Sequence, residues 1–168
     1  MHREEAITMA RTVALSHLNT PYLWGGDDPM AGFDCSGFCI EVLKSVGLLP
    51  RKGDWTAHGL WHIFKTVYTA TDSGHGDSHS SERPVEEMEE GCLVFWHSKH
   101  DSDRIVHVEY ALNKRLTIGA SGGGSANVDL DTAIQRNAYV KIRPVRPTYI
   151  HGLLYPFDNI PLENENTD

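Results

Sequence analysis

The chain lacks an excess of basic residues and lacks any long apolar stretch. Among its 168 residues, 15 Lys and Arg stand against 23 Asp and Glu, so the formal net charge is −8 with His neutral. Because binding to phosphates or to anionic lipid heads relies on clustered Lys and Arg, this charge predicts no nucleic-acid partner and no membrane surface. No apolar run approaches the ~20 residues that a membrane-spanning helix needs. Length and composition together predict one compact soluble domain with a single core, most simply a monomer.

Cysteine is scarce, and the amino terminus lacks a secretory pattern. Cys35, Cys39 and Cys92 cannot all pair within one chain, and the first two are spaced as one turn of a helix. Residues 1–19 carry acidic side chains near the start and a broken apolar pattern, whereas a secretory signal has a cationic start and a long apolar run. We therefore expect free thiols and synthesis in the cytoplasm, without export by that route.

Hydrophobic periodicity changes along the chain from a helical to a strand-like spacing. Apolar residues recur every three to four positions in three segments, which are 4–18, 35–46 and about 56–66. Asp34 can cap the second helix, and Gly47 can close it in a left-handed conformation. Short β-prone runs follow at 92–97, 104–112, 115–120 and 138–145. Helices followed by antiparallel strands predict an α+β fold with the helices packed on the sheet.

The sequence shows no internal repeat and no sign of a second domain. We expect one domain over residues 1–150 and a tail over 151–168 whose acidic end is disordered. Residues 71–84 are polar and rich in Gly and Ser, which predicts an exposed loop.

Two sequence patterns suggest ligand-binding sites, but neither matches such a site in full. His and Asp residues within 75–79 and 97–103 are of metal-ligating type, yet their spacing does not match a metal site. Residues 119–125 are glycine-rich but lack the lysine and the following helix of a phosphate-binding loop, which favours a flexible rim of a cleft. We therefore expect no metal and no cofactor.

Cys35 and His107 are the residues most suited to nucleophilic catalysis. Cys35 opens the second predicted helix, where unpaired backbone N–H groups and the helix dipole favour a thiolate over a thiol. His107 lies in a β-prone run, and strand alternation predicts that it shares a face with Ile105 and Glu109. A thiol nucleophile needs an imidazole within hydrogen-bond reach to activate it. By position alone, a buried structural cysteine and an ordinary polar histidine explain the same residues.

Three segments, in order, resemble a known family. PYLWGGDDPMAGFDCSGFCIEVLKSVGLLPR (21–51), GCLVFW (91–96) and RIVHVEYAL (104–112) resemble the NlpC/P60 cysteine peptidases, which cut bacterial cell-wall peptides. The first segment is specific, because the tyrosine-any-tryptophan-glycine loop and the Asp-Cys-Ser-Gly-Phe helix start seldom occur together elsewhere. The resemblance implies a papain-like fold in which the helix opened by Cys35 packs against a sheet that carries His107.

The resemblance also implies a substrate and the residues that bind it. The implied substrate is the stem peptide of peptidoglycan, cut at a peptide or isopeptide bond such as that between γ-linked D-glutamate and a diamino acid. The implied substrate-binding residues are Tyr22, Trp24, Asp34 and Ser36, with Ser36 near the free amino end of the substrate. Without a secretory signal, we favour a phage-type enzyme that is carried in a virion or released to the wall during lysis, over one that recycles wall fragments in the cytoplasm.

One position departs from the family pattern. About a dozen residues after the histidine, the family commonly has a second histidine or another polar residue that orients the base, but this chain has Gly119. A tight turn after residue 112 would place His107 opposite Gly119 or Ala120, and neither has a polar side chain. The acceptor is then a backbone carbonyl, an ordered water or Glu109, and a histidine introduced at Gly119 is expected to restore the usual arrangement.

The missing third residue keeps two alternatives beside a peptidoglycan endopeptidase. The same Cys-His pair can run acyl transfer or amide hydrolysis on non-wall substrates such as lipids or small amides. A catalytically silent module that binds the cell wall would need no third residue at all.

Overall fold

The computed structural model describes residues 1–71 and 85–159. The loop expected at 71–84 and the end of the tail expected to be disordered, residues 160–168, lie outside the described residues except for Thr71. No helix in the described part of the chain combines the length and the apolar character needed to cross a membrane.

The three long helices precede the strands of the main sheet, as the periodicity predicts, and a short helix that was not predicted lies between the last two predicted strands. The α-helices are α1 (Arg3–Ser16), α2 (Cys35–Ser45), α3 (Ala57–Thr71) and α4 (Leu130–Gln135). The strands of the main sheet are β3 (Leu93–Ser98), β4 (Asp101–Ala111), β5 (Leu116–Ser121), β6 (Tyr139–Pro144) and β7 (Ile150–Leu154). The short elements are β1 (Asp27–Asp28), β2 (Gly32–Phe33) and the 3-10 helices η1 (Val85–Glu87) and η2 (Pro156–Asn159).

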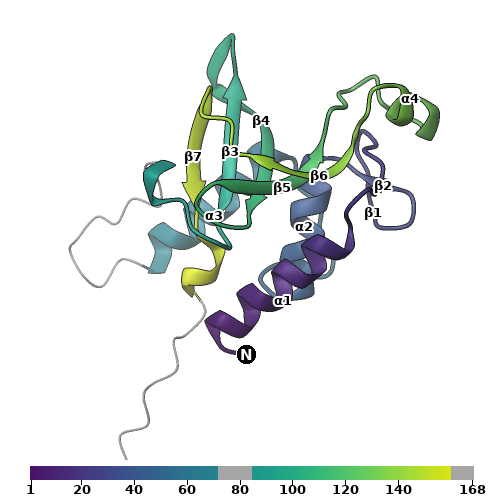
Figure 1. The fold of residues 1–168 in the computed structure, drawn as a ribbon. Helices are drawn as coiled ribbons and strands as arrows, with labels where there is room; N and C mark the ends of the chain where they lie inside the picture. Colours follow the sequence, from purple (N-terminus) through teal and green to yellow (C-terminus); the bar gives the residue numbers. More distant parts are fainter. Residues whose placement is uncertain (72–84, 160–168) are drawn as a thin grey trace, which may run out of the picture.

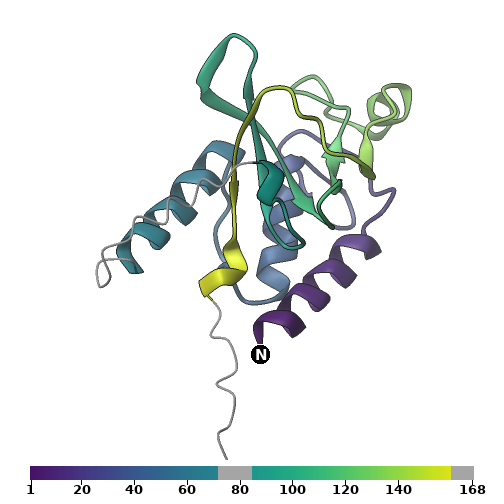
Figure 2. The ribbon, with the colours of Figure 1, turned by 60° about the vertical axis from the view of Figure 1, so that its left-hand side comes forward.

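The three long helices cover one face of an antiparallel sheet whose strand order is β6-β5-β4-β3-β7 (Figures 1 and 2). Helix α2 packs against β4 and β5, α3 packs against β4 and β7, and α1 packs against α2. The main core lies between these layers and is formed by apolar side chains of all three helices and of the facing strands. The predicted α+β fold is therefore confirmed, with α2 placed centrally on the sheet.

Helix α2 begins where the sequence predicts, because its first turn is held by side-chain and backbone contacts. The carboxylate of Asp34 accepts a hydrogen bond from the backbone N–H of Gly37 at 2.8 Å, which is an N-cap. A Cβ at Gly37 would lie only 2.0 Å from the carbonyl oxygen of Gly26, so this glycine allows the preceding loop to approach the helix. At the other end, Gly47 has φ +77°, in the left-handed region that closes helices.

The sheet extends past the domain boundary that we expect at residue 150. Strand β7 pairs with β3, with Leu93 opposite Leu154, and it forms an edge of the sheet. Tyr155 and Phe157 are buried beyond it. The boundary at 150 is therefore wrong: a five-residue strand flanked by loop-like sequence with Pro147 and Pro156 is too short to stand out by periodicity.

A bulge in β4 changes the face on which its residues lie. Trp96 of β3 is opposite His107, but the next residue, His97, is opposite Ile105, so Val106 is the extra residue. Ile105 packs in the core with Val108 instead of sharing a face with His107. The predicted alternation is therefore wrong at Ile105, because a bulge inverts the side-chain pattern on one side of it.

Candidate active site

Cys35 lies at the first position of α2, where backbone donors are free. Of the first four N–H groups of a helix, which have no intrahelical acceptor, that of Asp34 binds the carbonyl of Gly26 and that of Gly37 binds the Asp34 carboxylate. The N–H groups of Cys35 and Ser36 have no such partner among the described residues. Two donors are thus left beside the sulfur, where they can bind an oxygen that becomes negatively charged.

His107 lies between Cys35 and Glu109. The Cys35 side chain interacts with its imidazole and raises its pKa, and its Nε2 atom lies 2.7 Å from Oε1 of Glu109. Because Nε2 is used by the carboxylate, Nδ1 is the ring nitrogen left for the thiol. The ring also packs against the indole of Trp96, with 5.5 Å between centroids, which restricts its orientation. A cysteine from a helix, a histidine from a strand and a carboxylate therefore form one connected row.

The Glu109 side chain is only 1% exposed, and both of its carboxylate oxygens have partners within the protein. The hydroxyl of Thr117 donates to Oε2 at 2.6 Å, and the guanidinium of Arg143 forms an ion pair with Oε1. Sequence reasoning missed both partners. Arg143 lies directly opposite Thr117 in the β5–β6 pairing, so the signal for it was the register of a strand pair, which the sequence alone did not fix.

The strand register corrects the prediction for Gly119. Tyr110 is opposite Ile118 and Ala111 is opposite Thr117, so continuing the ladder places Glu109, and not His107, opposite Gly119. A Cβ at Gly119 would lie 2.6 Å from Cγ of Glu109. Position 119 is therefore not an empty place for an orienting residue: it is the space that the Glu109 side chain crosses. A histidine introduced there would displace Glu109, so the expectation that it restores the usual arrangement is not supported.

The charges in this row favour an imidazolium beside a carboxylate. Burial acts to lower the pKa of His107, but the hydrogen bonds to Cys35 and Glu109 and the charges of both outweigh it and raise the pKa to about 9. Burial acts to raise the pKa of Glu109, but His107 and Arg143 outweigh it and lower the pKa to about 2. A protonated imidazole held between a sulfur and a carboxylate is suited to stabilise a thiolate and to deliver a proton.

A cavity of about 720 Å³ opens beside Cys35 between the helices and β4. Of the four predicted substrate-binding residues, Trp24, Asp34 and Ser36 line this cavity, whereas Tyr22 is buried and lines no part of it. Both carboxylate oxygens of Asp34 are used within the protein, because Oδ1 binds Ser36 and Gly37 and Oδ2 accepts from the N–H of Gly25 at 3.1 Å. The main contribution of Asp34 is thus to hold the entrance loop to the start of α2.

Among the described residues, the other thiols and histidines do not belong to this row. Cys39 and Cys92 are fully buried, and burial, with the nearby charge of Cys35, raises the pKa of Cys39. In the described ranges, no three His, Cys, Asp or Glu side chains are grouped as metal ligands would be. His97 instead hydrogen-bonds through Nδ1 to the carbonyl of Ser98, and the group expected at 75–79 lies outside the described residues.

Comparison with known proteins agrees with this geometry. The model of the NlpC/P60 family matches residues 19–144, a range that contains the helix start, the strand with His107 and the Glu109 partners. The chain belongs to the NlpC/P60 family. Within this family, the bifunctional muramidase/DL-endopeptidase CwlT of Bacillus subtilis is 24% identical over 136 residues, which cover 79% of this chain and 35% of that protein.

Solved NlpC/P60 structures have the same fold. The P60 domain of antigen MAP1204 from M. avium subspecies paratuberculosis has a TM-score of 0.59 at 22% identity, over 91% of this chain and 95% of that one. RipB, a peptidoglycan hydrolase from Mycobacterium tuberculosis, has a TM-score of 0.59 at 22% identity, over 90% of this chain and 65% of that one. The chain spans about a third or less of the length of the first curated relatives that it matches. Likeness at this level of identity establishes the fold alone.

Proposed function

We propose that the protein is a thiol hydrolase that cleaves peptide or isopeptide bonds in peptidoglycan stem peptides. The observation that carries the proposal is the continuous row of Cys35, His107 and Glu109 within the NlpC/P60 fold. Such a row supplies a nucleophile, a general base and a group that fixes the tautomer of the base. The names of several relatives, which are endopeptidases or peptidoglycan hydrolases, support the substrate class.

The reaction follows from the order of the groups. His107 takes the proton of the Cys35 thiol, and the sulfur attacks the carbonyl carbon of the scissile amide. The N–H groups of Cys35 and Ser36 stabilise the resulting oxyanion. The tetrahedral intermediate expels the amine, which receives its proton from His107, and leaves a thioester on Cys35. A water, deprotonated by His107, then attacks the thioester and releases the acid and the thiol.

The cavity beside Cys35 receives the acyl half of the substrate. Its lining includes the aromatic rings of Trp24 and Trp55 and the carboxylates of Asp54, Asp101 and Asp103. These carboxylates outnumber the single guanidinium in the lining, that of Arg104, so the wall attracts a cationic group such as the free amino end of a short stem peptide. This agrees with the proposed place of Ser36 near the amino end, because the Ser36 hydroxyl, which donates to Asp34, still has lone pairs to accept from an ammonium.

We place the cleaved bond between γ-linked D-glutamate and a diamino acid. The name DL-endopeptidase of the B. subtilis relative supports this choice, whereas another relative in Escherichia coli is named a murein DD-endopeptidase. The two reactions release different products, so the bond is directly measurable.

The test is incubation of the purified protein with defined muropeptides, followed by mass spectrometry of the products. We expect a new amino end on the diamino acid, complete loss of this product in Cys35→Ala, and retention in Cys92→Ala, which removes another buried thiol. A new amino end on D-alanine would show that a different bond of the stem peptide is cleaved. Cleavage that persists in Cys35→Ala, or no cleavage of any muropeptide by wild type, would overturn the proposal.

A further inference from the structure

A second cavity, of about 380 Å³, lies on the other side of His107. His107, Arg143 and Arg146 line it, together with the turn at 121–123 that follows β5. Val106 lines both this cavity and the one beside Cys35, so the two spaces are neighbours across the bulge of β4. The glycine-rich stretch expected to form a cleft rim is therefore part of the wall of this second cavity.

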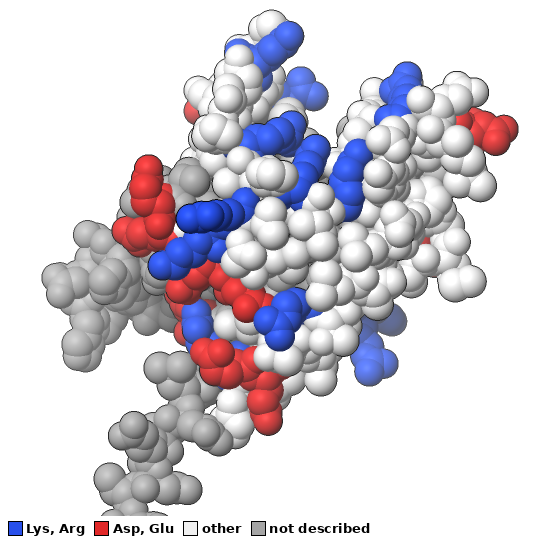
Figure 3. All heavy atoms as spheres, in the orientation of Figure 1, with Lys and Arg blue, Asp and Glu red and all other residues white. Residues whose placement is uncertain are grey.

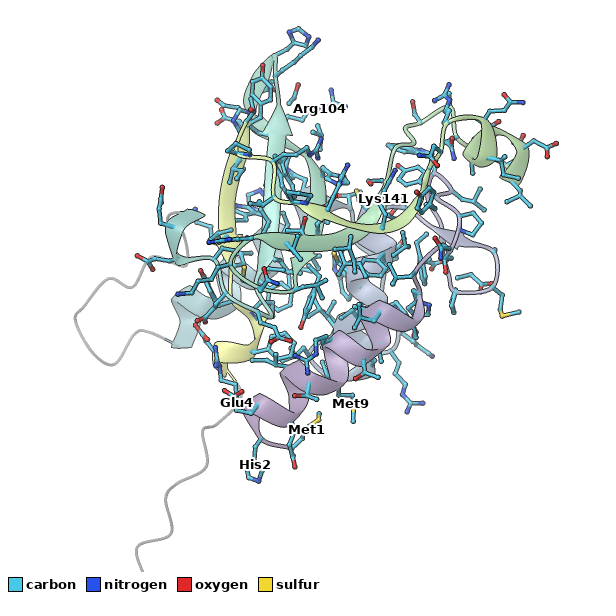
Figure 4. The ribbon with its side chains drawn as sticks, in the orientation of Figure 1. Met1, His2, Glu4, Met9, Arg104 and Lys141 are labelled. Carbon is cyan, nitrogen blue, oxygen red and sulfur yellow. The ribbon has the colours of Figure 1, made fainter. Side chains whose placement is uncertain are left out.

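The charges around the second cavity are mainly positive. Figure 3 shows Lys and Arg side chains gathered over the part of the surface that carries β6, and Lys141 projects from β6 in Figure 4. A Cβ at Gly122 of the cavity wall would lie 3.3 Å from Nζ of Lys141, so this amine lies beside the wall. Glu109, the carboxylate paired with Arg143, is already shared with His107. Glu109 forms no ion pair with the other two cations of this region, Lys141 and Arg146, among the described residues.

Arg146 is the cation best placed to bind a ligand. Its guanidinium lies over the indole of Trp96, 5.2 Å from the ring centroid, and the Trp96 N–H donates to its carbonyl at 2.9 Å, which orients the residue. It forms no ion pair with a carboxylate in residues 1–71 or 85–159. Burial and the charge of Arg143 lower the pKa of Arg146, and the charge of Glu109 opposes them only in part.

Unsatisfied polar atoms in the same wall provide an independent indication of a ligand. The hydroxyl of Ser121 and Nε of Arg143 are buried and have no hydrogen-bond partner in the part of the chain that the structure describes, and both residues line the cavity. Ser121 is only 3% exposed. Buried polar atoms without partners are rare in folded proteins, and two of the four in the described residues belong to the wall of this cavity, where a polar group of a ligand could satisfy them.

The proposed reaction determines which half of the substrate reaches this cavity. His107 gives its proton to the leaving amine, so the amine must lie next to the imidazole when the bond breaks. The cavity beside Cys35 is lined by the nucleophile and takes the acyl half. The cavity lined by His107 is therefore left for the residue that supplies the amine.

We propose that the second cavity binds a carboxylate of the residue that supplies the leaving amine, with Arg146 as its main contact. The inference rests on the proposed hydrolase function and adds a substrate requirement to it. A planar guanidinium matches a carboxylate through two parallel N–H donors, and the Ser121 hydroxyl lies in the same wall as a further donor. A diamino acid with a free carboxylate fits this description, whereas its carboxamide does not.

Two synthetic peptides test this requirement. They share one acyl half, and their leaving residue carries either a free carboxylate or a carboxamide. For wild type we expect kcat/KM to be about tenfold or more higher for the carboxylate, the scale of one charge-assisted hydrogen bond. In Arg146→Gln the ratio is expected to fall close to one through loss of carboxylate turnover, whereas Arg146→Lys retains part of it. Arg136→Gln, at the end of α4 and outside the cavity, is expected to keep the wild-type ratio.

The outcomes separate this inference from the proposed function. If wild type cleaves both peptides at equal rates, or if Arg146→Gln keeps the preference, the carboxylate site is wrong while the hydrolase remains. Calorimetry with Cys35→Ala protein and the two leaving products gives a readout without turnover, and tighter binding of the carboxylate product by about tenfold is expected. Equal affinities, or none for either product, would overturn the inference even if muropeptides are cleaved.

Discussion

A methyl group added at Gly119 should uncouple the base from its carboxylate. The Cβ of Gly119→Ala would lie 2.6 Å from Cγ, 3.2 Å from Cβ and 3.3 Å from Cδ of Glu109, whereas ordinary contacts begin at 3.4 Å. The Glu109 chain must therefore move by about 0.8 Å. It cannot do so freely, because Oε1 is bound to His107 at 2.7 Å and Oε2 to Thr117 at 2.6 Å.

The size of the effect follows from these contacts. Inserting a methyl group into a packed interior costs about 1–3 kcal/mol of unfolding free energy. A shift of this size in a group that positions the base costs on the order of a hundredfold in turnover. Because Glu109 helps to raise the pKa of His107 to about 9, its displacement also lowers that pKa toward the ordinary value of 6.5.

Three measurements check the prediction: urea unfolding, kcat/KM on a muropeptide, and titration of the His107 ring by NMR. Gly124→Ala is the matched control, because a Cβ there has nothing within 4 Å and should leave all three unchanged. If Gly119→Ala folds and keeps both the wild-type rate and the wild-type His107 pKa, then Glu109 does not lie over position 119, and its role as the orienting carboxylate is refuted.

Three further outcomes are expected. Iodoacetamide should label Cys35 before Cys39 in the folded protein, because Cys39 is fully buried; peptide mapping that finds Cys39 first refutes the choice of nucleophile. His107→Ala should lower kcat by about a hundredfold or more, the scale of a general acid–base group, whereas His97→Ala should not; comparable losses would move the base. Glu109→Gln should shift the alkaline limb of the kcat/KM profile to lower pH, because the carboxylate raises the pKa of His107 and the imidazolium is lost as pH rises. If the alkaline limb does not move, the charge of Glu109 does not affect the pKa of His107.

Local patterns were enough to predict where Cys35 and His107 lie in the fold. Cys35 follows a capping aspartate and precedes an apolar stripe of helical period, so its place at a helix start could be inferred from a few neighbours. His107 lies in a β-prone run, and the strand is present as expected. Both inferences needed only residues that are close together in the sequence.

The remainder of the site depends on strand pairing, which the sequence did not determine. The turn after β4 gives a register in which Glu109 faces Gly119, and this register differs by one residue from that of a minimal turn, which would pair His107 with Ala120. The bulge at Val106 places the Ile105 side chain on the opposite face of the sheet from the one that alternation predicts, and no residue type in that run indicates a bulge. Arg143 joins the site only through the pairing of β6 with β5. Each of these is a long-range choice among pairings of similar local quality.

The base and its carboxylate belong to the same strand, two residues apart. The distance from His107 to an orienting residue on β5 would depend on how β5 pairs with β4, so any relative motion of the two strands would change that distance. His107 and Glu109 instead move together with β4, and their separation is fixed by the pleat of a single strand. Fluctuations of the hairpin at residues 112–115 therefore leave the backbone spacing between the base and its carboxylate unchanged, whereas a change in the length of the hairpin would move Thr117 and Gly119 away from Glu109.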